Sequence, residues 1–229
     1  MHQELYDEED LKSIEYLILI ILGKAKGKIS VLHLQKIFFF LWKFHPDVKR
    51  LFEFVPHFKG PYSSDLQEII ENPTYVVDCW EYVPPKKSSE VDKIVGGYVR
   101  ITPRGKKLYE RVWQGLKEKG KEDKAALNIV SAIELIVPLY TKLEWDELLL
   151  LIYTDETNRY YSTRSELSQK VFKRAESIIN RLIKKGVITE DMKEDFLKRV
   201  KNSEWIFSKK HPDKDSLTII TINLPKSSS

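Results

Sequence analysis

Apolar side chains return every three or four residues along most of this chain, the spacing that places them on one face of an α-helix. The pattern is densest around Phe38, where nearly every residue is apolar, and Ser30 is a suitable N-cap for that helix. The same spacing predicts helices over residues 8–22, 30–45, 64–71, 102–119, 125–140, 145–153, 163–185 and 189–200. We therefore expect a mainly α-helical protein.

Two small β-hairpins are predicted between and after these helices. Residues 75–82 are largely β-branched or aromatic, and residues 97–101 form a second strand beyond a polar loop at 84–92. Residues 205–208 and 217–222 predict a terminal hairpin, whereas a basic, glycine-containing loop is predicted up to Lys28. Three helices followed by a hairpin are typical of a winged helix, so we expect a winged-helix-like N-terminal domain.

The charged, apolar-free segment 120–123 is the clearest candidate for a domain boundary. We accordingly predict a winged-helix-like domain over residues 1–120 and a helical domain with a basic helix and a terminal hairpin over residues 121–229. Both parts follow the same plan of apolar helices and then two strands. No residue-level repeat connects them, so the likeness is one of architecture.

Composition is that of an ordinary globular protein: 42% of the 229 residues are hydrophobic and 31% are charged. The formal net charge of +4 is only mildly basic, which by itself does not indicate nucleic-acid binding. Cys79 is the only cysteine, so an internal disulfide is excluded. The apolar run at 16–22 is too short to span a bilayer and follows acidic residues, unlike a signal peptide. We expect a cytoplasmic protein without a membrane span.

The sequence carries none of the patterns that mark catalytic, metal or cofactor sites. The five histidines are scattered without the paired spacing of a metal-binding helix, and no glycine-rich phosphate loop occurs. Acidic pairs such as Glu8-Glu9 lie in first helical turns, where the helix dipole already favours them. We therefore expect no enzymatic activity, no catalytic residues, no bound metal and no cofactor.

Acidic side chains mark the helix that would read DNA in a winged helix. The exposed positions of helix 64–71 include no Lys or Arg, and they carry Asp65, Glu68 and Glu71. Carboxylates would be repelled by phosphates, so this helix is a poor candidate for the major groove. We predict that these three acids contact a partner protein.

Basic side chains gather in two other places. Near the predicted wing, the candidates for nucleic-acid contacts are Lys86, Lys87, Arg100, Arg104, Lys106 and Lys107. On helix 163–185, the candidates lie mostly opposite the apolar stripe and are Arg164, Lys170, Lys173, Arg174, Arg181 and Lys184. An ordinary solvated helix face is an equal alternative for this second set. Contacts from either set to phosphates would add affinity without sequence preference.

Short motifs resemble a known family. Leu34-Gln35-Lys36-Ile37 with its aromatic run, Gly60-Pro61-Tyr62-Ser63 and the strand end at 101–105 are similar to marks of the Panacea domain, found in SocA-like antitoxins and in phage- and defence-associated proteins. Segments 147–153, 165–167 and 184–188 resemble a second part present in related, uncharacterised bacterial and archaeal proteins. The aromatic run is bulkier than usual here. The resemblance implies a non-catalytic accessory or antitoxin-like role and transfers no catalytic residue.

Taken with the charge pattern, the resemblance gives our functional prediction. The chain is expected to be an accessory or antitoxin-like subunit of a prokaryotic defence or toxin system. Its partner would be a toxin, a nuclease or an Argonaute-like effector, and its basic surfaces would assist binding of DNA or RNA. The alternative is a winged-helix transcription regulator that binds operator DNA alone, and an enzyme is a distant third.

Overall fold

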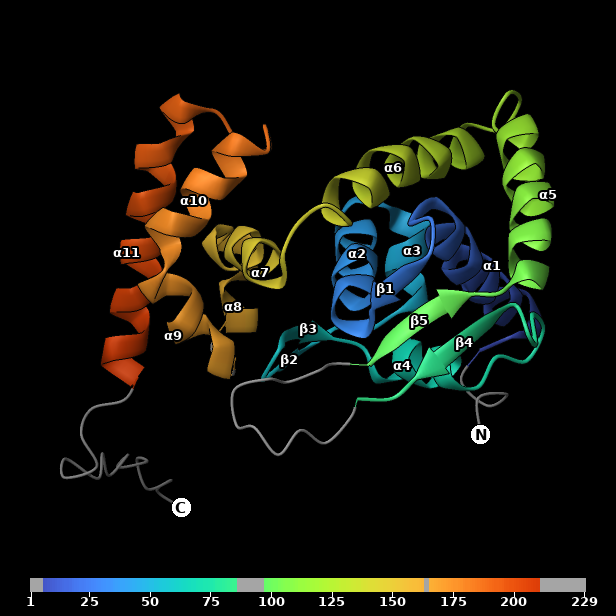
Figure 1. Cartoon of the computed structure of the whole chain (residues 1–229), viewed down its shortest axis with the longest axis horizontal. Helices are drawn as coiled ribbons and strands as arrows, with labels where there is room; N and C mark the ends of the chain where they lie inside the picture. Colours follow the sequence, from blue (N-terminus) through green and yellow to red (C-terminus); the bar gives the residue numbers. More distant parts are fainter. Residues whose placement is uncertain (1–5, 86–96, 163–164, 211–229) are drawn as a thin grey trace, which may run out of the picture.

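The computed structural model of the chain describes residues 6–85, 97–162 and 165–210 and is mainly helical, with two small antiparallel sheets (Figure 1). This confirms the predicted fold class at that level. The elements up to the middle of the chain are α1 (Glu8–Lys24), β1 (Lys28–Ser30), α2 (Val31–Phe44), α3 (Pro46–Leu51), β2 (Val55–His57), β3 (Gly60–Tyr62), α4 (Ser64–Glu71), β4 (Trp80–Val83), β5 (Tyr98–Ile101), α5 (Pro103–Lys119) and α6 (Lys124–Tyr140). The remaining elements are α7 (Trp145–Thr154), η2 (Glu156–Asn158), α8 (Arg159–Ser162), α9 (Glu166–Lys173), α10 (Ala175–Lys184), η3 (Glu190–Met192) and α11 (Lys193–Lys210).

The larger sheet has the strand order β1-β5-β4, with β5 in the middle. Val99 of β5 pairs with Ile29 of β1 on one side and with Tyr82 of β4 on the other. The sequence predicted β4 and β5 but placed Lys28 in a loop, so β1 is an addition. The second sheet is a hairpin of β2 and β3, whose turn uses Gly60 at φ +87°, a conformation that glycine adopts easily.

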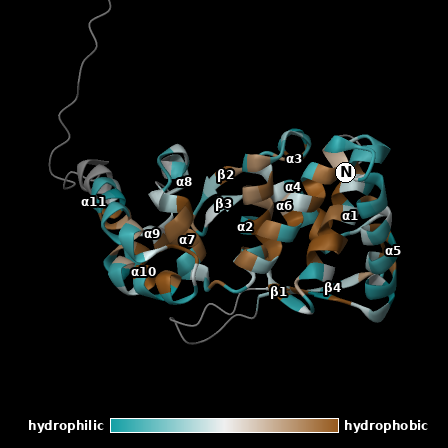
Figure 2. Cartoon of the chain, turned by 90° about the horizontal axis from the view of Figure 1, so that it is seen from above, coloured by the Kyte–Doolittle hydropathy of each residue, from teal (hydrophilic) through white to brown (hydrophobic). Residues whose placement is uncertain are grey.

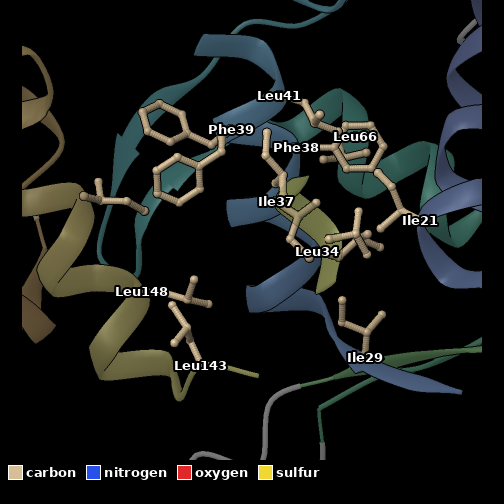
Figure 3. Packing of buried hydrophobic residues seen from close by; sticks show 14 of the residues in the cluster. Ile21, Ile29, Leu34, Ile37, Phe38, Phe39, Leu41, Leu66, Leu143 and Leu148 are labelled. Atoms are coloured by element: carbon tan, nitrogen blue, oxygen red, sulfur yellow. The ribbon is translucent and has the colours of Figure 1, made fainter. Parts of the chain in front are cut away.

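Helix α2 lies at the centre of the hydrophobic core. Phe38 and Leu41 point toward α1 and α4, whereas Phe39 points toward the side of α7, so α2 serves two interfaces (Figure 3). Phe40 stacks on Tyr140 of α6 with ring centroids 4.2 Å apart. Because the helix is covered on several sides, its run of consecutive apolar residues is explained by burial, as the sequence predicted.

The predicted domain boundary at residue 120 does not coincide with a division in the packing of the helices. Helix α6 follows that boundary, yet it packs against α1, α2 and α5 of the first half. The helices from α7 onward form the second group, seen on the opposite side of α2 from α1 and α5 (Figure 1). The reason is that α6 is apolar on the face that meets α2, whereas the charged segment before it is only a turn. Hydrophilic residues concentrate on outer helices such as α5 and α11 (Figure 2).

The apolar run of α1 is part of the core, with Ile18, Leu19 and Ile21 fully buried. Within residues 6–85, 97–162 and 165–210, no helix has both the length and the apolar character needed to cross a membrane.

Residues 75–79 do not form the strand that their composition predicted. The buried Glu15 side chain accepts hydrogen bonds from the backbone N–H groups of Thr74, Tyr75 and Val76, at 2.6, 2.8 and 2.8 Å. These donors are therefore committed to a carboxylate and cannot pair with a neighbouring strand. The β-strand begins only at Trp80.

The predicted terminal hairpin is wrong in its first strand. Residues 205–208 lie in the last turns of α11, and residues 217–222 lie outside the described residues. A short apolar run does not distinguish a strand from a helix. Here the helix continues from upstream, where Phe196, Val200 and Ser203 are buried at helical spacing.

The single helix predicted up to residue 185 is two helices, α9 and α10, separated at Arg174. Each has a different anchor. Ser165, before α9, donates to the Phe58 carbonyl of the β2–β3 hairpin at 3.0 Å, while α10 is tied to α7 through Arg181. The basic residues predicted on one helix therefore belong to two helices.

Gly105 supplies a direct test of how α5 docks. A Cβ at Gly105 would stand 1.9 Å from the Cys79 carbonyl oxygen, which also accepts the Thr102 N–H at 3.0 Å. Gly105→Ala must therefore displace α5, and we expect it to lower the free energy of unfolding by about 2 kcal/mol in urea titrations. Gly115, on the same helix, has open space around it. Gly115→Ala should therefore raise the free energy of unfolding by up to about 1 kcal/mol, because Ala favours the helix more than Gly does. Equal stability of the two variants would contradict this packing.

Candidate functional site

The predicted partner-binding acids lie along α4, but the fold uses part of their bonding capacity. Asp65 is half-buried and accepts a hydrogen bond from the Tyr6 hydroxyl at 3.1 Å. Glu71 is exposed and accepts one from Gln67 at 2.7 Å, while Glu68 is half-buried. The side chain of Ser63 caps the N-terminus of this helix. The acids thus share one short helix, with Glu71 the most accessible.

The basic residues near β4 and β5 differ in whether their side chains form ion pairs. Arg100 forms an ion pair with Glu81 across the two strands at 2.5 Å, and Arg104 lies 3.6 Å from Asp78. The next two candidates, in the first turn of α5, are exposed lysines without an ion pair among the described residues: Lys106 and Lys107. The other two, Lys86 and Lys87, lie outside the described residues.

In the second half, Arg181 has a structural role that the sequence did not predict. Its guanidinium lies 2.7 Å from Asp146 and 3.0 Å from Glu147, two buried carboxylates at the start of α7. Lys185 joins Glu147 at 2.6 Å. Burial would raise the pKa of Glu147, but hydrogen bonds from Lys185, the Glu144 backbone and Arg181 lower it overall. The sequence predicted that Arg181 contacts phosphates. The structure instead pairs its guanidinium with the buried acids Asp146 and Glu147.

The other basic residues of α9 and α10 remain on the surface. Arg174 is exposed and lies 3.6 Å from Asp146. Lys170, Lys173 and Lys184 are exposed and have no ion pair within the described part of the chain, and Arg164 lies outside it. Sequence spacing places basic side chains on a helix but cannot say which of them face carboxylates of another helix.

A pocket of about 400 Å³ lies where the two halves of the chain meet. The first half contributes residues of α2, the β2–β3 hairpin, α4 and β4, and the second contributes residues of α7 and α9. Its ionisable and phenolic side chains include Lys36, His57, Lys59, Tyr62, Tyr82 and Lys170. No Asp or Glu belongs to the lining formed by the described residues. Of the site residues predicted from sequence, Lys170 is the one that this lining contains.

Gln35 and Lys36 connect α2 to the hairpin beneath this pocket. The Gln35 amide donates to the Ser63 carbonyl at 2.9 Å and accepts from the Ser63 N–H at 3.0 Å. The Lys36 ammonium donates to the Pro61 carbonyl at 2.6 Å. Two of the motifs that carry the family resemblance, Leu34-Gln35-Lys36-Ile37 and Gly60-Pro61-Tyr62-Ser63, are therefore in direct contact. Polar side chains of α2 satisfy backbone groups of the second motif.

Lys36 is a charged side chain in an apolar place. Only 2% of its surface is exposed, and no carboxylate pairs with it among the described residues. Burial, and secondarily the nearby Lys59, lower the pKa of Lys36 to about 7. An ammonium has three donors, and the Pro61 carbonyl accepts one of them. In the sequence Lys36 appears only as part of the Leu34-Gln35-Lys36-Ile37 motif, and its burial depends on contacts with the β2–β3 hairpin.

His57 adds a second basic group to the same pocket. Burial, then the positive charges of Lys36 and Lys59, lower the pKa of His57. Its Nδ1 atom is buried and has no hydrogen-bond partner within the described part of the chain. The imidazole ring stacks against Tyr62, with centroids 4.7 Å apart. His57 thus presents an unused polar atom close to two lysines.

The second half fixes the hairpin that carries these groups. The Tyr153 hydroxyl of α7 donates to Ser165 at 2.6 Å, and Ser165 donates to the Phe58 carbonyl at 3.0 Å. A Cβ at Gly60 would stand 2.9 Å from Leu149 and 3.0 Å from the Tyr153 hydroxyl, so glycine permits this close approach. The pocket therefore has walls from two parts of the chain that are directly bonded to each other.

Across residues 6–85, 97–162 and 165–210, no group of three or more His, Cys, Asp or Glu side chains is placed to hold a metal ion. Comparison with models of known protein families, with curated proteins and with solved structures gives no match to the chain. The Panacea-like resemblance therefore stays a prediction that rests on the quoted motifs.

Proposed function

We propose that the chain is a non-catalytic accessory or antitoxin-like subunit of a prokaryotic defence or toxin system. In this role it binds a partner protein through the region of α4 and assists nucleic-acid binding through its exposed lysines. The system and the partner class, a toxin, nuclease or Argonaute-like effector, come from the motif resemblance. The surfaces come from the positions of the charged side chains.

The observation that carries the proposal is the acidic character of α4, the helix that precedes strands β4 and β5. Along the chain, α1, β1 and α2 are followed by α3 and the β2–β3 hairpin, and then by α4, β4 and β5, with β5 paired to both β1 and β4. In a winged helix the helix before the wing enters the major groove, and α4 would be that helix here. It carries Asp65, Glu68 and Glu71 and no basic residue. Phosphates would be repelled there, so a protein surface is the better partner.

Nucleic acid, if bound, would contact lysines that no carboxylate neutralises among the described residues. Two are Lys106 and Lys107 on α5, and three are Lys170, Lys173 and Lys184 on α9 and α10. Arg181 is left out because it is held by Asp146 and Glu147. Contacts of this kind neutralise phosphates and release counterions, giving affinity that depends on salt and hardly on sequence.

Fluorescence anisotropy with duplex DNA and single-stranded RNA at several salt concentrations tests both parts. Replacing Lys170, Lys173 and Lys184 by Ala should reduce the log–log salt slope by about one unit per lysine that contacts a phosphate. Neutralising α4 with Asp65→Asn, Glu68→Gln and Glu71→Gln should leave the affinity unchanged or slightly raised. The same neutralised chain, co-expressed with the product of an adjacent gene, should lose capture of that protein.

The operator-binding alternative predicts the opposite pattern. Sequence-specific DNA binding that disappears in the α4-neutralised chain would mean that α4 reads bases, and the chain would then be a transcription regulator. Absence of any salt-dependent binding would remove the nucleic-acid part of the proposal, while loss of partner capture would still support the accessory role.

A further inference from the structure

The pocket between α2, the β2–β3 hairpin and α9 shares only Lys170 with the surfaces of the proposed accessory function. Its basic side chains include the buried Lys36, and its apolar walls include Phe58, Trp145 and Leu167. We propose that this pocket binds a small organic anion, with its carboxylate or phosphate near Lys36, His57 and Lys59 and its apolar body against Trp145 and Leu167.

The first support is that the basic side chains of the pocket have no acidic partner within the described lining. Three lysines and two histidines line the pocket, and no carboxylate is found in the lining among the described residues. Buried charges are normally paired, because removal of an ion from water is expensive. Glu71, which is not among the lining residues, hydrogen-bonds the lining residue Tyr82. An anion inside the pocket would supply the missing partner.

The second support is unused hydrogen-bonding capacity. Among the described residues, Lys36 has one acceptor, the Pro61 carbonyl, although an ammonium carries three N–H donors. The buried His57 Nδ1 atom has no partner in that part of the chain. Carboxylate and phosphate oxygens accept several hydrogen bonds at once, so one anionic group would accept from Lys36 and from His57 in the tautomer that carries its proton on Nδ1.

The third support is size and lining. A volume of about 400 Å³ falls within the usual range for small-molecule sites, which combine apolar walls with a few polar groups. Tyr62 and Tyr82 add ring surface, and burial raises the pKa of both phenols, so they stay neutral at physiological pH. Lys170 at the second-half edge places a further positive charge near the opening. A ligand here would touch both halves of the chain.

Binding should be coupled to protonation. With its pKa near 7, Lys36 is half neutral at pH 7 and mostly neutral at pH 8. An anion next to it favours the ammonium form and so raises that pKa. Binding at pH 8 should therefore take up protons, and affinity should fall as the pH rises above 7. His57, whose pKa is lowered, can add to this uptake in the same direction.

Calorimetry on the full chain tests the proposal with three matched probes: 1-naphthoate, 1-naphthyl phosphate and the neutral 1-naphthamide. We expect at least one anion to bind at least ten times more tightly than the amide, with net proton uptake at pH 8 when buffers of different ionisation enthalpy are compared. Tighter binding of the phosphate assigns the site to phosphates, and tighter binding of the naphthoate assigns it to carboxylates. Failure of both anions to bind up to about 5 mM overturns the proposal.

A variant comparison locates the site. Lys36→Met should reduce anion affinity at least ten-fold and remove most of the proton uptake, whereas Lys184→Met, on the exposed face of α10 outside this lining, should change neither. Unchanged anion binding in a folded Lys36→Met chain overturns the proposal. The wild-type comparison of anion and amide needs no variant, so the test survives even if Lys36→Met does not fold. It is independent of DNA, RNA or partner binding.

Discussion

Replacing Glu15 by Ala is expected to lower the free energy of unfolding by about 4 kcal/mol, because each hydrogen bond to a charged group is worth roughly 1.5–3 kcal/mol. The Glu15 side chain is fully buried in α1, and its two oxygens accept backbone N–H groups of Thr74, Tyr75 and Val76. Removal leaves three donors without their acceptor and opens a space beside the loop before β4. Few single substitutions away from a metal or disulfide have effects of this size.

Urea unfolding at neutral pH measures this effect. Glu15→Gln retains the shape and one acceptor oxygen, so it should fall between wild type and Glu15→Ala. Glu9→Ala provides the matched control, since Glu9 is an exposed acid in the first turn of the same helix and its loss should cost less than about 1 kcal/mol. If the free energy of unfolding of Glu15→Ala lies within about 1 kcal/mol of the wild-type value, the loop N–H groups must bond to other acceptors.

Elements whose signals are local were predictable from the sequence. Ser30 accepts from the His33 N–H as the N-cap of α2, and Thr102 caps α5 in front of Pro103. Such signals need only neighbouring residues. The loop held by Glu15 shows the limit, because its carboxylate lies about sixty positions from the N–H groups it binds. Residues 75–79 have strand-like composition, and only the fold reveals that their donors are already used.

The same limit applies to the candidate sites. Strand β1 is three residues long and pairs with β5 about seventy residues later, so no local pattern identifies it. The basic face of residues 163–185 follows from spacing alone, whereas the engagement of Arg181 by Asp146 and Glu147 depends on α10 packing against α7. Lys36 was not among the site residues predicted from sequence, because the pocket that it lines requires residues from both halves of the chain.

Lys36 should also make stability depend on pH in an unusual direction. Its pKa is about 7 in the fold, against 10.5 for an ordinary lysine, so between these values the unfolded chain binds more protons. Stability then rises with pH, and below pH 7 both states are protonated and this dependence vanishes. For one such group the gain between pH 7 and pH 10 is about 3 kcal/mol.

The comparison that isolates this contribution is wild type against Lys36→Met, unfolded in urea at pH 7 and pH 10. Phenols with raised pKa values, such as Tyr62 and Tyr82, titrate in both chains and cancel in the difference. The wild-type chain should gain about 3 kcal/mol relative to the variant across this range. A parallel pH dependence in the two chains would mean that Lys36 keeps its charge at pH 10. The burial of an uncompensated amine beneath the hairpin, on which the anion site depends, would then be wrong.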